Sequence, residues 1–422
     1  MRSRLEAVIG DYNIYSPRRL QFDTQQKIPF RVSPEPLNLS PDQKKEIEAI
    51  GSDITSYYSA VDQLYRTDPR VQQLLDRGKP EIFCGDKISP SHYLFIRPDL
   101  IITASGFSIC EVETSPFGLA LAEILNRAYR QEDYETMIDD GTLSVHMQAS
   151  TPIEGSIIYS QKTSHFAGQM AFLADEVFSG QSRDWQATHA DNLNGSSPKT
   201  IYRGFYLAEL QTDPSIASLL TGPTSDGHDL LPSPTPHMEE KATLALLWDK
   251  RFESYFETEL GEGGFNHLRH VVPPSWIVGE EEYFVPGMPN GISSSVDLAR
   301  FSRSKRAFVL KPSGFRTDAS WGEGVKFLQK KSAVAAALAV KEALDDRSSL
   351  HIVQQFTKAA EMPMAYEDNG NDPTPMSARV RLTPYFSMVP GKEGQLIAIK
   401  ATGCEDTDLV HASSVSINTA VN

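Results

Sequence analysis

Four charged side chains stand close together in two short segments, with a spacing that would suit metal or phosphate chemistry. Arg97 and Asp99 lie in IRPD, and Glu111 and Glu113 lie in CEVET. Side chains two residues apart in a β-strand point to the same face. If the two segments pair as a hairpin, one face of it carries three carboxylates and one guanidinium.

The residues between the two segments predict such a hairpin. The tripeptide 104–106 reads as a three-residue loop with Gly106 in the left-handed conformation. Residues whose numbers add to 210 then face each other, so Asp99 opposes Glu111. The same rule pairs the guanidinium with the second glutamate.

The remaining hairpin residues carry two further expectations. Cys110 and Val112 should point to the face opposite the acids. Pro98 lacks a backbone donor, so its strand should be an edge strand or should carry a local bulge.

Two carboxylates that face each other across a hairpin repel by about 3 to 4 kcal/mol before screening. Arg97 can neutralise one of them, and a hard divalent cation such as Mg²⁺, which prefers oxygen ligands, would neutralise the remainder. The simpler alternative is a solvated sheet face with one surface ion pair. The apolar neighbours favour a hairpin inside the protein: Phe95, Ile96, Ile101 and Ile109.

One lysine stands at the mouth of a loop that could bind phosphate. Lys311 ends the apolar run AFVLK, and the loop that follows contains Ser313, Gly314 and Gly322. Glycine and serine let backbone N–H groups approach phosphate oxygens, and a lysine supplies positive charge. The loop matches neither GxxxxGK[ST] nor GxGxxG, so a surface loop with an exposed lysine stays an alternative.

A second lysine, Lys241, lies in HMEEKATLALLW, whose apolar residues predict a largely buried helix. A lysine there must either reach solvent or meet an anion. Other polar residues at strand positions are Gln354 and Gln355 in HIVQQF, and Arg379 and Arg381 on one face of a later strand. Taken alone, each of these is also compatible with an ordinary polar surface.

A mixed α/β framework is expected to position these residues. Helices are predicted after Ser40-Pro41 and Asp68-Pro69, and over 116–140 with Gly141 as its stop, 237–256 and 331–345. Strands are predicted at 156–160, 200–206, 306–312, 350–356, 377–389 and 394–402. The polar segments 221–236, 279–295 and 366–375 predict loops.

Length and composition limit the class of protein. The 422 residues suggest about three folding units, which we place at 1–90 (a helical N-terminal region), 91–235 (hairpin and α/β) and 236–422. The net charge of −15 argues against nucleic acid and anionic membranes as partners. Three cysteines, and the absence of an apolar run of about 18 residues, predict a soluble, cytoplasmic protein.

Taken in order, these segments resemble the synthetase domain of glutathionylspermidine synthase and its circularly permuted ATP-grasp relatives. That family has Arg-x-Asp and, after a short hairpin, Glu-x-Asn; then a lysine in a KAxLxxLW-type helix, a lysine in a VKP strand before a glycine loop, and a QQ strand. The corresponding segments here are IRPD, CEVETS, KATLALLW, VLKPSG and IVQQF. The resemblance covers roughly residues 90–420.

The resemblance implies an α/β (α+β) ATP-grasp-like fold, in which two subdomains clasp ATP next to a pre-ATP-grasp layer. It implies Mg²⁺ on Asp99, Glu111 and Glu113. Phosphate would be held by Lys241, Lys311 and the loop residues Ser313, Gly314 and Gly322. Adenine would be bordered by Gln354 and Gln355. The catalytic arginines would be Arg97, at the γ-phosphoryl group or acyl phosphate, and Arg381 or Arg379, at the acceptor carboxylate.

The implied reaction joins a small-molecule carboxylate to an amine through an acyl phosphate, with ATP and Mg²⁺ as cofactors. One departure is Glu113, which stands where the family has Asn and makes the site more negative. Three alternatives stay open: a phosphotransferase with another acceptor, a catalytically degenerate nucleotide-binding or scaffold protein, and a plain metal-binding protein.

Overall fold

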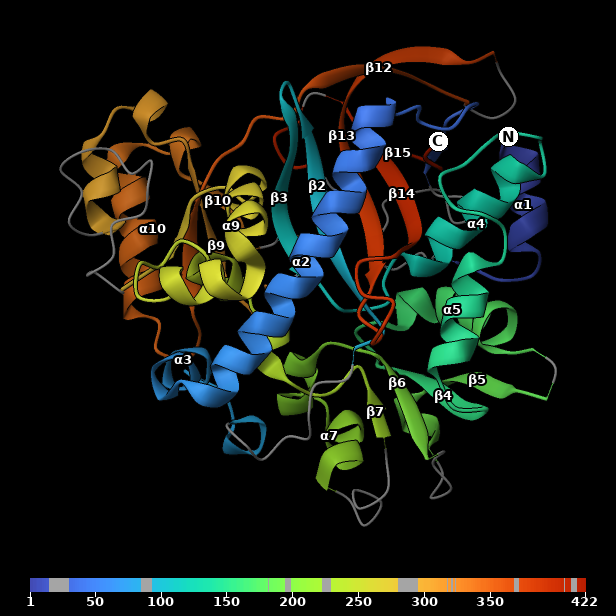
Figure 1. Cartoon of the computed structure of the whole chain (residues 1–422), viewed down its shortest axis with the longest axis horizontal. Coiled ribbons are helices and arrows are strands. Elements are labelled where there is room, and N and C mark those ends of the chain that lie inside the picture. The colour runs from blue at the N-terminus through green and yellow to red at the C-terminus, as the bar shows by residue number, and fades with distance from the viewer. Residues whose placement is uncertain are drawn as a thin grey trace.

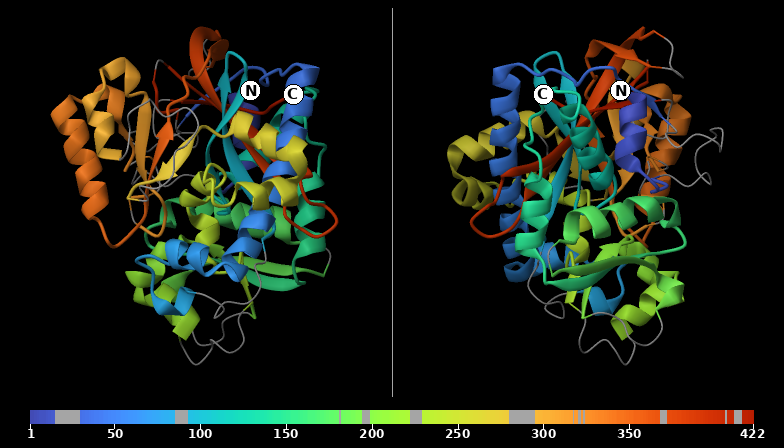
Figure 2. Two further views of the ribbon diagram at one scale, coloured as in Figure 1. Left: turned by 60° about the vertical axis from the view of Figure 1, so that its left-hand side comes forward. Right: turned by 90° about the vertical axis from the view of Figure 1, so that its right-hand side faces the viewer.

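The computed structural model describes residues 1–14, 30–84, 93–180, 182–193, 199–221, 229–279, 295–316, 318–319, 322, 324–367, 372–405, 407–410 and 416–422. These residues form a mixed α/β structure with three sheets (Figures 1 and 2). The three predicted loop segments lie partly outside the described residues, at 222–228, 280–294 and 368–371.

The largest sheet contains the hairpin. Its strands follow the order β1-β15-β14-β13-β2-β3, with β12 paired to β13 beside this path. The strand bounds are β1 Arg31–Val32, β2 Phe95–Thr103, β3 Gly106–Glu113, β12 Glu361–Tyr366, β13 Thr374–Ser387, β14 Leu396–Cys404 and β15 Ser416–Thr419. The hairpin thus pairs with β13 from the C-terminal part of the chain, while the boundaries placed near residues 90 and 235 stay predictions.

The charged end of the hairpin has the expected register. Arg97 pairs with Glu113, and Asp99 pairs with Glu111. All four side chains line one cavity, so the prediction that they share a face is confirmed.

The turn of the hairpin differs from the prediction. Thr103 pairs with Gly106, so the loop has two residues, 104–105, and the three-residue loop was wrong. Gly106 belongs to β3, with φ at 136°. Between the pairs Leu100–Ile109 and Asp99–Glu111, Cys110 is an extra residue in β3, and this bulge restores the predicted register beyond it.

The bulge also changes where one side chain points. Cys110 lines the cavity beside the acids, and not the opposite face, because the bulge interrupts the alternation at this position. Val112 packs in the core as expected. The bulge lies close to Pro98, but its extra residue is in β3 and not in the strand of Pro98, and β2 is no edge strand, since β3 and β13 pair with it on either side.

A smaller antiparallel sheet carries the second lysine strand. Its order is β10-β9-β11-β8, with β8 Ser275–Ile277, β9 Phe308–Pro312, β10 Lys326–Phe327 and β11 His351–Gln355. Lys311 on β9 pairs with Ile352 on β11. Helix α10 (Ala333–Asp345) lies on the outer side of this sheet in Figure 1 and is capped by Ser332.

A third, parallel sheet forms the expected α/β layer. Its order is β5-β4-β6-β7, with β4 Glu154–Tyr159, β5 Asp184–His189, β6 Thr200–Gly204 and β7 Asp229–Leu231. The prediction missed β5, and β7 lies in a segment expected to be a loop. The smaller helices of this part are α6 Ala167–Phe172 and α7 Pro214–Thr221.

The N-terminal region is helical, as expected, with α1 Arg2–Ile9, α2 Pro41–Thr67 and α3 Pro69–Leu75. Ser40 and Gln43 cap α2 reciprocally, and Pro41 occupies its first turn. Figure 1 shows α2 running across the large sheet in front of β2 and β13.

The helix predicted over 116–140 is two shorter helices. Helix α4 spans Leu119–Arg130 and α5 spans Thr142–Ser150, and Gly141 precedes α5 with a φ of 77° instead of stopping the first helix. The Arg130 guanidinium donates hydrogen bonds to Thr136 Oγ1 and to the Ile138 carbonyl. These contacts hold a turn that the apolar periodicity did not indicate.

The helix predicted over 237–256 is also interrupted. Helix α8 spans only Ala242–Leu246, and α9 spans Glu253–Val271. Lys241 precedes α8, and its backbone N–H donates to the Ser313 carbonyl at 3.1 Å. This long-range bond ties the start of α8 to the end of β9.

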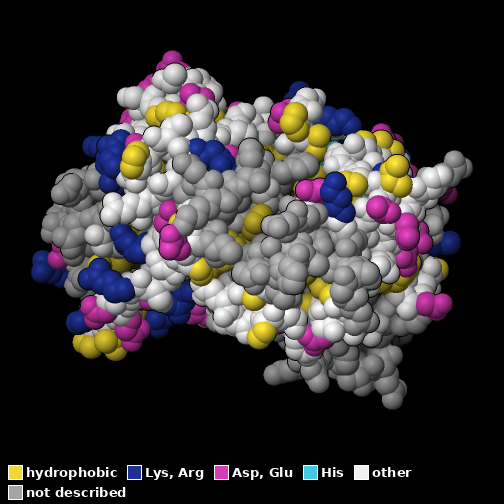
Figure 3. Space-filling model, turned by 90° about the horizontal axis from the view of Figure 1, so that it is seen from below, with side chains coloured by type: hydrophobic (Ala, Val, Ile, Leu, Met, Phe, Trp, Pro, Cys, Tyr) yellow, Lys and Arg dark blue, Asp and Glu magenta, His cyan; other side chains and the backbone are white. Residues whose placement is uncertain are grey.

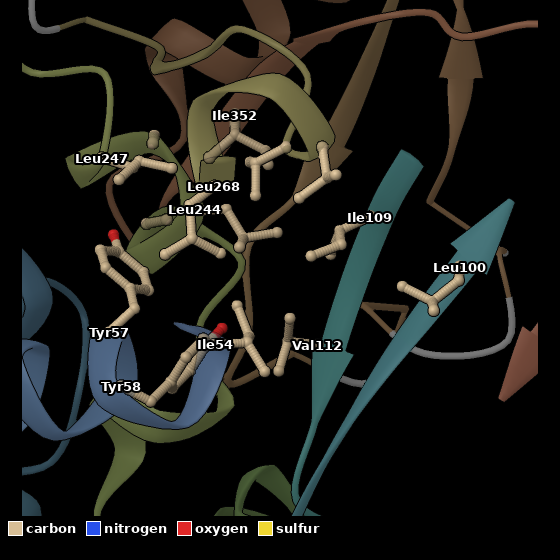
Figure 4. Close-up of a cluster of buried hydrophobic side chains, with 14 of the residues drawn as sticks. Ile54, Tyr57, Tyr58, Leu100, Ile109, Val112, Leu244, Leu247, Leu268 and Ile352 are labelled. Carbon is tan, nitrogen blue, oxygen red and sulfur yellow. The ribbon is translucent and has the colours of Figure 1, made fainter. Parts of the chain in front are cut away.

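The main core joins the hairpin to these helices. Figure 4 shows Ile54, Tyr57 and Tyr58 of α2 facing Leu244 and the hairpin. The hydroxyls of both tyrosines bond to Thr243, Tyr57 to its carbonyl and Tyr58 to its Oγ1. The core therefore fixes α8, and with it the backbone of Lys241, against the side of the hairpin that packs in the core.

The described part of the face in Figure 3 carries side chains of both charges, with apolar groups between them. Among the described residues, no helix combines the length and the apolar character that crossing a bilayer requires.

An ionic contact joins α2 to α9 near the surface. His267 bonds to Asp53 Oδ2 at 2.6 Å and to Glu46 Oε1 at 3.1 Å. The hydrogen bond to Asp53, followed by that to Glu46, raises the pKa of His267 to about 9 in spite of partial burial.

We expect His267→Gln to make the free energy of unfolding less dependent on pH. The folded pKa of about 9 lies above the ordinary value of about 6.5, so the stabilisation is complete below the ordinary value and is lost as the pH rises through the folded one. Screening limits it to about 1 kcal/mol. Urea unfolding at a pH below this window and at a pH above it should show a larger fall in the free energy of unfolding for the wild type than for His267→Gln. An equal fall in both would contradict the assignment.

Candidate active site

A cavity of about 450 Å³ lies between the large sheet and the small sheet. Most of the predicted site residues line it: Arg97, Asp99, Glu111, Glu113, Lys311, Gly322, Gln354, Gln355 and Arg381. They come from β2, β3, β9, β11, β13 and one loop, which are far apart in the sequence. The structure thus brings together residues that the sequence could only suggest one by one.

Asp99 lies between two arginines. Its Oδ2 accepts a hydrogen bond from Arg381 Nη1 at 2.9 Å, and its Oδ1 lies 3.5 Å from Arg97 Nε. Arg381 reaches it from β13, two residues from the point where β13 runs level with Asp99. The aspartate is almost wholly buried, so these two cations offset the free-energy cost of removing its charge from water.

Glu111 is paired with Lys241, whose Nζ lies 2.7 Å from Glu111 Oε1. Burial alone would raise the pKa of Glu111, but Lys241 and Lys311 together outweigh it, and the net shift is downward. Burial would likewise lower the pKa of Lys241, but Glu111, with smaller contributions from Glu113 and Glu240, reverses the sign. Both groups are therefore charged at neutral pH, and the anion that Lys241 was expected to meet is Glu111.

Glu113 pairs with Arg97, with 2.6 Å between Oε2 and Nη2. Burial raises the pKa of Glu113 more than Arg97 lowers it, and the nearby Glu111 adds to the upward shift. Arg97 also donates to the Phe117 carbonyl at 2.8 Å. Each of the three acids thus has its own cation, which already offsets the mutual repulsion from which a metal was inferred.

Lys311 projects into the cavity from β9. Its Nζ donates to the Cys110 carbonyl at 2.9 Å and to Gln354 Oε1 at 2.7 Å, and Gln354 in turn donates to Ser275 Oγ at 3.2 Å. Burial lowers the pKa of Lys311, because it disfavours the charged form. Lys311 forms no ion pair with a carboxylate among the described residues, so an anion that binds beside its ammonium group would be stabilised. The Gln354 amide thus accepts a hydrogen bond from Lys311, whereas Gln355, which also lines the cavity, is exposed.

A buried polar cluster holds the residues on either side of Lys241, Glu240 and Ala242. Ser313 Oγ accepts from the Ala242 N–H at 2.7 Å and donates to Glu240 Oε2. Glu240 also forms an ion pair of 2.7 Å with Lys79. Ser313 therefore positions α8 and does not line the cavity.

The glycine loop approaches this cluster closely. A Cβ on Gly314 would lie 2.4 Å from the Glu239 carbonyl, so a larger residue cannot be placed there without moving the backbone. Gly314 lines a small neighbouring pocket with Lys241, whereas Gly322 lines the main cavity with a φ of 72°.

One part of the cavity wall is apolar. It is lined by Val309, Val325, Phe327, Phe356 and Leu409, next to Gln355. The rings of Phe327 and Phe356 meet edge to face at 5.7 Å. This combination of apolar walls and a few amide groups is typical of small-molecule sites.

Two arginines that share one strand face have different surroundings. Arg381 lines the cavity, but Arg379 does not; Arg379 pairs at 3.0 Å with Asp408, which does line the cavity. Of the two candidates for an acceptor-binding arginine, only Arg381 reaches the cavity.

The sequence reasoning missed several residues that line the cavity. Lys400 and Thr383 lie side by side on β14 and β13, and the rings of Phe117, Phe166 and Tyr206 cover the adjoining wall. One signal was available for Lys400, because it is the only charged residue in the strand segment LIAIKATGC.

The acids suit a hard cation by their chemistry, since three carboxylates supply oxygen ligands in one cavity. Among the described residues, however, no group of three or more His, Cys, Asp or Glu side chains has the arrangement of a metal site. A bound cation would have to compete with Arg381, Lys241 and Arg97 for these oxygens. Mg²⁺ therefore stays a prediction.

Comparison with known proteins supports the architecture alone. No family model matches the chain, and no curated protein matches it. Among solved structures, it is similar to a glutathione synthetase-like effector (GSS30) from Globodera pallida in its apo form, with a TM-score of 0.54 and 10% identity over 100% of this chain and 96% of that chain. The chain thus has a mixed α/β fold similar to that of a glutathione synthetase-like protein.

Proposed function

We propose that this chain is an ATP-dependent ligase that joins a carboxylate to an amine, on an ATP-grasp-like arrangement of two sheets around the nucleotide. The observation that carries the proposal is that Lys311 and the acids of one hairpin line a single cavity, to which Lys241 is joined through its ion pair with Glu111. Their order in the sequence resembles that of the glutathionylspermidine synthase family, and the fold similarity points the same way.

The cavity offers a place for each part of ATP. The apolar part beside Phe327 and Gln355 suits adenine, and Lys311 would face the phosphates. Lys241 would approach them from the small neighbouring pocket, beside Glu111. Arg97 and Arg381, on either side of Asp99, would stabilise charge on the transferring phosphoryl group. When bound, Mg²⁺ would neutralise phosphate oxygens, with the hairpin acids as its holders.

The reaction has two steps. A carboxylate oxygen of the substrate attacks the γ-phosphorus, its bond to the β–γ bridging oxygen breaks, and ADP leaves. The amine nitrogen then attacks the acyl carbon of the acyl phosphate, the C–O bond breaks, inorganic phosphate leaves, and the amine loses a proton. The residues at this cavity serve positioning and charge neutralisation, which dominate phosphoryl transfer.

The acyl phosphate gives the most direct test of this chemistry. With Mg²⁺-ATP and a mixture of amino and simple carboxylic acids, hydroxylamine should trap a hydroxamate, and ADP should form in equal amount. ADP without hydroxamate would favour a phosphotransferase with a non-carboxylate acceptor. No ADP from a folded protein would remove the catalytic proposal.

A binding protein without catalysis is the second candidate. The observation that favours it is that each hairpin acid already has a cation of the chain as its partner. Such a site could hold a nucleotide without a metal. Binding of ATP that is equally tight in EDTA, with no turnover, would support this candidate; binding that requires Mg²⁺ would support the ligase.

A further inference from the structure

The end of the cavity away from Lys311 contains a lysine to which the proposed nucleotide site gives no role. Lys400 on β14 lies directly opposite Thr383 on β13. Its side chain is 4% exposed, and its Nζ donates a hydrogen bond of 3.0 Å to Thr402 Oγ1. Within the described part of the chain, no carboxylate lies at ion-pair distance from it.

The surroundings of Lys400 are unfavourable for a lone cation. Burial and then the nearby Arg381 lower the pKa of Lys400 to about 7, and Arg97 acts in the same direction while Asp99 opposes it. A buried ammonium that faces two guanidinium groups is stabilised when an anion binds beside it.

A second polar group in the same place also lacks a partner. Thr383 is 2% exposed, and its Oγ1 has no hydrogen-bond partner among the described residues. Buried hydroxyls are normally satisfied, and a hydroxyl that lines a cavity is satisfied when a ligand binds. Thr383 and Lys400 would therefore serve the same ligand.

Helix α4 begins at this point. Gly118, which precedes it with a φ of 87° and without a side-chain cap, lines the cavity. A Cβ on Gly118 would lie 3.1 Å from the Tyr385 hydroxyl and 3.4 Å from Lys400 Cε, so the start of the helix lies directly beside the lysine. The N-terminus of a 12-residue helix adds a favourable field for an anion.

The strand order separates this group from the phosphate lysines. Lys400, Thr383, Asp99 and Glu111 lie on the four successive strands β14, β13, β2 and β3. Neighbouring strands are about 4.8 Å apart, so Lys400 lies some three strand spacings, or roughly 14 Å, from the strand of Glu111. Lys311 bonds to the Cys110 carbonyl on β3, so β2 and β13 lie between the strand that Lys311 contacts and the strand of Lys400.

We propose that Lys400, Thr383 and the start of α4 bind a carboxylate group of the acid substrate. This inference rests on the proposed ligase function. The rings of Phe117, Phe166 and Tyr206 line the adjoining wall, so the body of that acid is apolar or aromatic, and not a second strongly charged group.

Benzoate and acetate are suitable probes, measured by calorimetry in the presence and absence of Mg²⁺-AMPPNP. Benzoate should bind one to one and more tightly than acetate. Lys400→Met should weaken benzoate at least ~10-fold, the scale of a lost charge-assisted hydrogen bond, and Thr383→Val about 3-fold. Lys392→Met, at an exposed position before β14, should leave binding unchanged.

Other outcomes separate this inference from the proposed function. If Mg²⁺-ATP binds but benzoate does not, or binds Lys400→Met as well as wild type, the carboxylate site is overturned and the ligase proposal stands. If benzoate binds through Lys400 but Mg²⁺-ATP does not bind, the ligase proposal fails. A loss of Mg²⁺-ATP affinity in Lys400→Met as large as in Lys311→Met would assign Lys400 to the phosphates and overturn the inference. Should Lys400→Met fail to fold, Thr383→Val decides.

Discussion

Lys311→Met is expected to lower the rate of ATP turnover at least ~100-fold, the scale found when a preorganised charge at a reacting group is removed. Lys311 extends into the cavity from β9, where burial lowers its pKa and an ammonium faces the space assigned to phosphate. Methionine keeps much of the apolar stem and removes the charge.

The cost of Lys311→Met in stability should be modest. The change leaves two acceptors, the Cys110 carbonyl and Gln354 Oε1, without this donor, which costs about 1 to 3 kcal/mol. ATP hydrolysis or ligation, measured beside thermal unfolding, checks both parts. Lys392→Met is the control for a lysine lost from the surface. Full turnover in Lys311→Met would exclude its role at the phosphates.

Lys79→Met is expected to have the opposite signature, a large loss of stability. Lys79 and Glu240 form an ion pair of 2.7 Å in which each side chain is 1% exposed. Removing one partner leaves a buried charge uncompensated and should lower the free energy of unfolding by about 3 to 5 kcal/mol. Because Glu240 bonds to Ser313, which holds the start of α8, Lys241 should also be less well positioned.

Urea unfolding measures this effect, and the chain offers a matched control. Lys341 and Asp345 form a pair of similar length, 2.6 Å, on the exposed side of α10. Lys341→Met should cost about 1 kcal/mol or less, since solvent screens such a pair. Equal losses in Lys79→Met and Lys341→Met would show that the buried pair does not support the fold.

The charged end of the hairpin could be predicted because its geometry is local. Strand alternation and the pairing of Arg97 with Glu113 need only the sequence between them. The turn was nevertheless misjudged by one residue, and a bulge corrected the error. The two errors in register cancelled: the turn is one residue shorter than expected, and β3 contains one extra residue, Cys110.

Other parts of the fold depend on contacts across the chain. The helix that contains Lys241 was expected to be continuous, but the bond from its backbone N–H to Ser313 sets where α8 begins. Apolar periodicity continues through such an interruption, because the residues on both sides still face the same core.

The ion pairs of the cavity could not be predicted from the sequence, because they too join distant parts of the chain. The partner of Glu111 is Lys241, 130 positions away in the chain, and the repulsion that suggested a metal is offset by such partners. Lys400 was overlooked because its strand reads as an ordinary buried strand. Lys400 is also a lone lysine among apolar residues, so, like Lys241, it must either reach solvent or meet an anion.

The central claim is that distant lysines and the hairpin acids converge on one bound triphosphate. Isothermal titration with Mg²⁺-AMPPNP tests it most directly. We predict saturable one-to-one binding to the wild type and to Lys392→Met, a loss of at least ~10-fold in affinity in Lys311→Met, and weaker binding in EDTA. Absence of binding to the folded wild type, or equal affinity in Lys311→Met, would contradict the claim.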